Sequence, residues 1–195
     1  MGEHDWHYPA PTCGDATWTR LAELVAGGEY LLHGSQTPGL DVLEPNAPLD
    51  FSPDAFSKAT AVFATEDPTW AMAYALRSPA RRRFLNACFY RGGSAGDWSE
   101  RRIFLSYAVG DDGHPTLSPG VVYVLGRDAF TRMPSYTDPA LGLITECQFV
   151  STAPVRVVTE ISVGPANLPI EPHFHDDDVV SERSARRPDG FPWLD

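Results

Sequence analysis

The residues best suited to chemistry begin with the tripeptide His33-Gly34-Ser35, which follows the apolar run Tyr30-Leu31-Leu32. The run predicts a buried strand over residues 29–33 that ends in this tripeptide. An imidazole nitrogen can bond a hydroxyl, and a glycine has no Cβ, so a flat ligand can approach its backbone closely. The strand end is therefore a candidate binding site for a small molecule such as NAD.

Two aromatic residues, Phe63 and Tyr74, are a second candidate because they lie eleven residues apart on a predicted strand-turn-helix unit. Residues 61–64 form a short apolar run, and Asp67-Pro68 is typical of a helix start, so we expect a helix over 67–78. This unit can bring both rings together around a planar ligand. The alternative is that both rings only fill the core.

Glu146 is the third candidate, because it is a carboxylate inside the apolar stretch 143–150. An unpaired carboxylate is costly to bury, so we expect Glu146 to face a cleft or a partner. Strand alternation would also allow the side chain to point to solvent.

Three blocks in this order resemble the ADP-ribosyltransferase superfamily in its His-Tyr-Glu branch, the branch of diphtheria toxin and the poly(ADP-ribose) polymerase catalytic domains. The blocks are Leu32-His33-Gly34-Ser35, the segment from Phe63 to Tyr74, and the segment from Thr145 to Val150 followed by the segment from Pro154 to Ile161. The resemblance covers residues 29–163 as short motifs. It implies an α+β fold, an ADP-ribosyltransferase-like split β-sandwich of two packed sheets with flanking helices.

The resemblance also implies an activity, mono-ADP-ribosyl transfer with NAD as co-substrate and without a metal. In the family pattern Glu146 stabilises the ribosyl cation, and His33, Gly34 and Ser35 belong to the cofactor site with Phe63 and Tyr74. His33 would bind the adenosine-side ribose, and Gly34 the nicotinamide amide.

Two positions depart from the family. Phe63 stands where the diphtheria toxin family has tyrosine, and Ile144 stands where arginine-specific relatives have glutamate, which disfavours arginine as acceptor. The expected loop 136–142 has no side chain that identifies an acceptor, so protein, nucleic acid and small molecules all stay open. A binding module without turnover, an NAD glycohydrolase and a sheet-rich protein unrelated to NAD are the alternatives.

The remaining sequence predicts a single domain over residues 1–163 and a polar extension over 164–195. Asp15 or Thr17 can cap a helix that ends at Gly27-Gly28. Apolar stretches separated by Gly, Pro and Asp predict a strand-rich second half, at residues 84–90, 102–109, 120–125, 143–150 and 155–163. In the extension, His173 and His175 are expected in a solvated surface run and not at a metal.

Composition limits the partners. The net charge of −11 gives no strong nucleic-acid signal, and no apolar segment predicts a signal peptide or a membrane span. The three cysteines are widely spaced and suggest neither a CxxC metal pair nor a disulfide framework, which favours a reducing compartment. We therefore expect a cytoplasmic protein with no membrane partner, and leave secretion without a signal peptide open.

Overall fold

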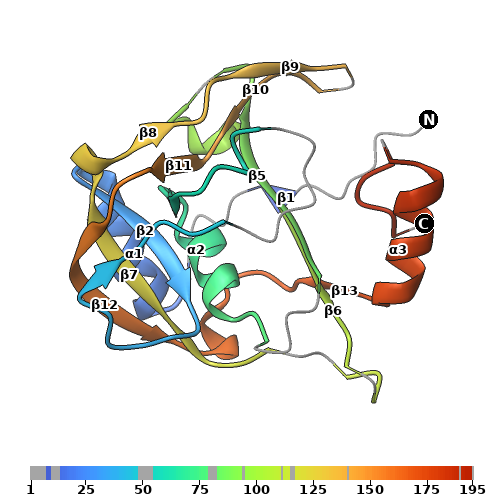
Figure 1. Ribbon diagram of the computed structural model, residues 1–195, viewed down its shortest axis with the longest axis horizontal. Coiled ribbons are helices and arrows are strands. Elements are labelled where there is room, and N and C mark those ends of the chain that lie inside the picture. Colours follow the sequence, from blue (N-terminus) through green and yellow to red (C-terminus); the bar gives the residue numbers. More distant parts are fainter. Residues whose placement is uncertain are drawn as a thin grey trace.

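The computed structural model describes residues 8–9, 14–47, 55–78, 83–93, 95–110, 112–114, 117–139, 141–188 and 190–194. In this part of the chain two packed β-sheets and three α-helices confirm an α+β fold (Figure 1). One sheet has the strand order β1-β6-β5-β10-β9, with β13 beside β6, and the other has the order β3-β12-β7-β2-β4-β11-β8. The first sheet consists of β1 (Tyr8–Pro9), β5 (Phe84–Arg91), β6 (Arg101–Ala108), β9 (Tyr136–Asp138), β10 (Gly142–Glu146) and β13 (His173–His175). The second consists of β2 (Tyr30–Ser35), β3 (Val42–Leu43), β4 (Val62–Thr65), β7 (Gly120–Gly126), β8 (Thr131–Arg132), β11 (Gln148–Ser151) and β12 (Val155–Val163).

Helix α2 (Pro68–Ala75) lies between the two sheets, which explains why nearly all of its residues are buried (Figure 1). Its start agrees with the sequence, because the Asp67 side chain accepts a hydrogen bond from the Trp70 backbone N–H at 2.9 Å and Pro68 follows as the first helical residue. The helix ends at Ala75, before the expected Ser78. Side chains on one side pack on β2 and β7, and those on the other side pack on β5 and β6.

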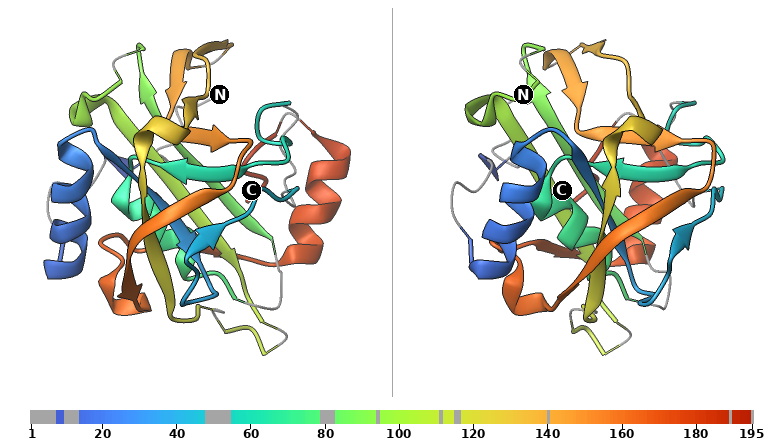
Figure 2. Two further views of the ribbon diagram at one scale, coloured as in Figure 1. Left: turned by 60° about the vertical axis from the view of Figure 1, so that its left-hand side comes forward. Right: turned by 90° about the vertical axis from the view of Figure 1, so that its left-hand side faces the viewer.

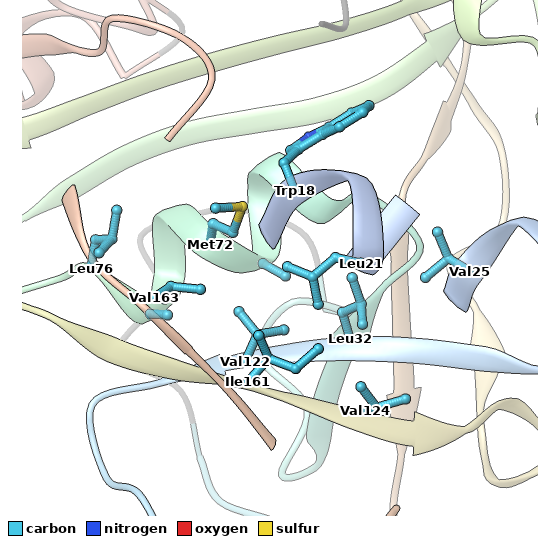
Figure 3. Close-up of a cluster of buried hydrophobic side chains, with 12 residues drawn as sticks. Trp18, Leu21, Val25, Leu32, Met72, Leu76, Val122, Val124, Ile161 and Val163 are labelled. Atoms are coloured by element: carbon cyan, nitrogen blue, oxygen red, sulfur yellow. The ribbon is translucent and has the colours of Figure 1, made fainter. Parts of the chain in front are cut away.

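The other two α-helices lie on opposite sides of the molecule (Figure 2). Helix α1 (Ala16–Ala26) is capped by Asp15, as the sequence predicts, and its apolar face packs over α2, β2 and β7 (Figure 3). Helix α3 (Asp177–Arg186) packs through Val180 against β5 and β6. No helix in the described part of the chain has both the length and the apolar character needed to cross a bilayer. The short 3-10 turns are η1 (Trp98–Glu100), η2 (Arg127–Ala129) and η3 (Pro165–Asn167).

The expected strand over residues 143–150 is wrong as one element. It is divided into β10, which pairs with β5 and β9, and β11, which pairs with β4 and β8 in the other sheet. Cys147 lies at the division, and its backbone N–H donates to the carbonyl of Cys88 at 3.0 Å. The chain therefore crosses from one sheet to the other immediately after Glu146, a change that local apolar patterning cannot reveal.

The expectation of a solvated run at His173 and His175 is also wrong. Strand β13 pairs in parallel with β6, the ring of His173 stacks on Phe104 at 5.3 Å, and His175 is 6% exposed. Alternate residues of β6 point away from α2, so the apolar ones among them need a cover on that face. The C-terminal segment supplies this cover despite its polar composition.

Candidate functional site

His33 lies at a divergence between two strands of the second sheet. Strand β2 pairs with β7 along its whole length but pairs with β4 only where Leu32 faces Thr65. Beyond that pair, Nδ1 of the half-buried His33 ring lies 2.7 Å from the carbonyl oxygen of Phe63 on β4. The His33 side chain thus closes the gap that backbone pairing leaves open.

This contact fixes the chemistry of the His33 ring. A carbonyl only accepts hydrogen bonds, so Nδ1 carries the proton, and Nε2 of a neutral ring is then an acceptor. Burial lowers the pKa of His33, and this effect outweighs the opposing hydrogen bond to Phe63. At neutral pH the ring is therefore uncharged and suited to accept a hydrogen bond from a hydroxyl.

Gly34 lies where helix α2 comes closest to β2. A Cβ added to Gly34 would lie 2.0 Å from the carbonyl oxygen of Ala71 and 2.8 Å from Cβ of Tyr74. Phe63 on β4 lies on the same face of the sheet as Gly34, because each is two residues from the Leu32–Thr65 pair, but β2 and β4 no longer pair at this level. Gly34 and Tyr74 are thus in close contact, and Phe63 shares their side of the sheet.

The Tyr74 ring is also part of the packing between α2 and β5. It meets Trp70 and Phe84 edge-on at centroid distances of 5.9 Å and 5.2 Å, and its hydroxyl donates to Oδ1 of Asn86 at 3.2 Å. The Arg77 guanidinium lies 5.7 Å from the ring centre. Part of the Tyr74 ring surface therefore fills the core, as one of the two interpretations of the sequence predicts.

Ser35 ends β2 and shapes the turn that follows. Its Oγ accepts a hydrogen bond from the Thr37 backbone N–H at 3.1 Å. The neighbouring Gln36 side chain donates to the backbone carbonyls of Ala75 and Ser118, which attaches the turn to the end of α2. Through this contact Ser35 stabilises the turn after β2.

Glu146 is half-buried at the end of β10, and groups from two other strands hold it. The Tyr136 hydroxyl donates to its Oε1 at 2.8 Å, and Nη1 of Arg132 donates to its backbone carbonyl at 3.0 Å. Arg132 also bonds both carboxylate oxygens of Glu66, at 2.5 Å and 2.6 Å. The carboxylate therefore has a partner, but that partner is itself exposed, so the cleft expected from the sequence stays a prediction.

The sheet sets the relation of Glu146 to the other candidates. Gln148, two residues after Glu146, pairs with Thr65, which in turn pairs with Leu32 beside His33. Strands lie about 4.8 Å apart, so β11 and β2 are about 10 Å apart across β4. The structure places Gly34 against Tyr74 and bonds His33 to the Phe63 carbonyl, whereas Glu146 is connected to these residues only through the pairing of β11 with β4 and of β4 with β2.

A buried polar cluster beside Glu146 was missed by the sequence analysis. Nε of Arg101 lies 2.7 Å from Oδ2 of Asp67, both side chains are 0% exposed, and the Cys88 thiol donates to the same oxygen at 3.0 Å. The Arg101 guanidinium also lies 3.6 Å from the ring centre of Trp98. The sequence identifies Asp67 only as a helix cap. It could not predict the cluster, because Cys88 and Arg101 are distant from Asp67 along the chain.

This cluster contains the donor types of a metal site but does not suit a cation. One donor atom each from Asp67, Cys88 and Cys147 lies within 4.8 Å of the others. Burial raises the pKa of both thiols, so they stay protonated at neutral pH, and the Arg101 charge already neutralises Asp67. The arrangement is a buried ion pair with two thiols packed against it.

A second polar cluster fixes the C-terminal segment to β6. Oγ of Ser106 lies 2.8 Å from Nδ1 of His175, and Nε2 of His175 lies 3.5 Å from Oδ1 of Asp177. The order hydroxyl, imidazole, carboxylate is that of a hydrolytic triad, but Ser106 is 0% exposed. A substrate cannot reach that hydroxyl, so the contacts serve docking of the segment.

Comparison of the chain with protein-family models, with curated proteins and with solved structures gives no match in any of the three.

Proposed function

We propose that this protein is an NAD-dependent mono-ADP-ribosyltransferase, which cleaves the bond between nicotinamide and ribose and transfers ADP-ribose to an acceptor. The observation that carries the proposal is the close contact of Gly34 with Tyr74 on α2, next to a neutral His33 that bonds the backbone carbonyl of Phe63. A pyridinium ring needs flat apolar walls, and its amide needs backbone partners. The strand edge at Gly34 supports both requirements.

Each residue has a role in this proposal. Nicotinamide lies between Phe63 and Tyr74, with its amide on the Gly34 backbone, where β2 no longer pairs with β4. The Nε2 atom of His33 accepts a hydrogen bond from a hydroxyl of the adenosine ribose. Ser35 holds the turn beside this strand edge through the Thr37 N–H.

Glu146 is the proposed catalytic residue. The bond between the ribose anomeric carbon and the nicotinamide nitrogen breaks first, its electron pair leaves with neutral nicotinamide, and the ribose becomes oxocarbenium-like. A carboxylate beside that centre stabilises the transition state more than the ground state. A nucleophile of the acceptor then bonds the anomeric carbon and loses its proton to solvent.

The experiment is to incubate the purified full chain with NAD and to measure released nicotinamide by chromatography. We expect release by the wild type and a loss of at least about 100-fold in Glu146→Gln, which keeps the shape but removes the charge. Glu23→Gln, an exposed position on α1, is the matched control and should behave as wild type. Wild-type protein that releases no nicotinamide, or equal rates in the two variants, would contradict the proposal.

A second candidate is a binding module that holds a nucleotide or protein without turnover. Phe63 in place of the tyrosine of the diphtheria toxin family favours it, because the ring can still stack on a ligand but offers no hydroxyl. NAD binding in calorimetry without nicotinamide release identifies this module. If release does occur, free ADP-ribose as the sole product identifies an NAD glycohydrolase, and labelled acceptor identifies a transferase.

A further inference from the structure

The contact between Tyr136 and Glu146 has the geometry of a positioning interaction. On the paired strands β9 and β10, Tyr136 faces Ile144, so its side chain lies on the same face as Glu146 two residues further along. Diagonal neighbours of this kind are about 7–8 Å apart at Cα, which a tyrosine spans. The hydroxyl reaches Oε1 of Glu146 at 2.8 Å.

Neighbouring residues hold both Tyr136 and Glu146 in place. Oγ of Ser135, the residue before β9, lies 2.7 Å from Oγ1 of Thr145 on β10, which connects the start of β9 to the strand that carries Glu146. On the other side, Arg132 on β8 bonds the Glu146 carbonyl at 3.0 Å and is itself held by Glu66. The backbone and the carboxylate of Glu146 are therefore held by different strands.

We propose that Tyr136 is a positioning residue that orients the Glu146 carboxylate for the ribose. This inference rests on the proposed function. Stabilisation of an oxocarbenium-like centre needs a carboxylate that is already oriented when charge develops. An O–H donor at Oε1 restricts the rotation of the group.

The position of Tyr136 separates this role from a purely structural one. Its side chain is 40% exposed on the edge strand of the sheet. Removal of the hydroxyl therefore leaves the core intact and lets water reach Glu146. Tyr136→Phe keeps the ring and should leave the thermal unfolding midpoint within about 2 °C of the wild type.

The test compares wild type, Tyr136→Phe and Tyr30→Phe in the nicotinamide-release assay over a range of NAD concentrations. We expect Tyr136→Phe to lower kcat about 10-fold with KM changed less than about 2-fold. Tyr30→Phe, a partly buried position on β2 with no role in the proposed site, should match the wild type.

The outcomes are distinct. The expected fall in kcat, with KM and the unfolding midpoint little changed, supports the inference. An active wild type with an unchanged kcat in Tyr136→Phe overturns the inference and leaves the proposed function intact. An unfolding midpoint that falls in parallel with activity shows a structural role and overturns it as well. A wild type that releases no nicotinamide overturns both.

Discussion

Asp67→Asn tests whether charge or capping keeps Asp67 in the core. Asparagine is as good a helix cap as aspartate, so the bond from the Trp70 N–H survives. The other oxygen becomes an NH₂ group that faces the Arg101 guanidinium and the Cys88 thiol. Because both charged side chains are 0% exposed, loss of the carboxylate leaves a buried cation without compensation, which costs about 3–5 kcal/mol.

The assay is urea unfolding, followed by tryptophan fluorescence, with thermal unfolding as a check. The expected loss corresponds to a fall of about 6–20 °C in Tm for a chain of this size. Asp97→Asn is the matched control, because Asp97 is an exposed cap of η1, and it should change stability by less than about 0.5 kcal/mol. An Asp67→Asn loss below about 1 kcal/mol, no larger than that of the control, would refute the reasoning.

Four further predictions concern the site and the C-terminal segment. Gly34→Ala should lower stability by about 1–3 kcal/mol, measured by urea unfolding, because the new Cβ meets the backbone of α2; an unchanged midpoint would show that α2 is not held this closely. Burial lowers the pKa of His175 in the folded state, so below about pH 6.5 the unfolded chain binds the proton more readily, and the stability that His175 contributes is lost as pH falls. The stability difference between wild type and His175→Gln should therefore shrink between pH 7.5 and pH 5, and a constant difference would count against a buried neutral ring. Cys88 and Cys147 should react with a thiol reagent only after unfolding, since both are fully buried; rapid labelling of either residue in native Cys13→Ser protein would contradict the cluster. Tyr74→Ala should weaken NAD binding in calorimetry, whereas Glu146→Gln should lower turnover far more than affinity, and equal mild effects would refute these roles.

Local signals predicted the elements that carry the first half of the candidate site. A capping aspartate, the proline after it and a short apolar run are enough to predict β4 and the start of α2, and the same reasoning places α1 and β2. Gly34 was singled out for a ligand, but its close contact with α2 shows that packing alone requires a glycine there. This contact depends on how helix α2 packs on strand β2, and no local sequence pattern predicts that packing.

Long-range pairing accounts for what the sequence could not predict. Apolar residues continue from 143 to 150, so nothing local indicates that the chain changes sheets at Cys147. Tyr136 lies in a segment expected to be a loop, yet it forms β9 and reaches Glu146. The ion pair of Asp67 and Arg101 joins the N-cap of α2 to the start of β6, which only the packing of the folded chain brings together.

The central claim, that one site binds NAD with residues from β2, β4, α2 and β10, is tested most directly by a crystal structure of Glu146→Gln with intact NAD. The account predicts the nicotinamide ring between Phe63 and Tyr74, its amide on the Gly34 backbone and the nicotinamide ribose beside residue 146. NAD bound at another place, or a ribose remote from residue 146, would contradict it.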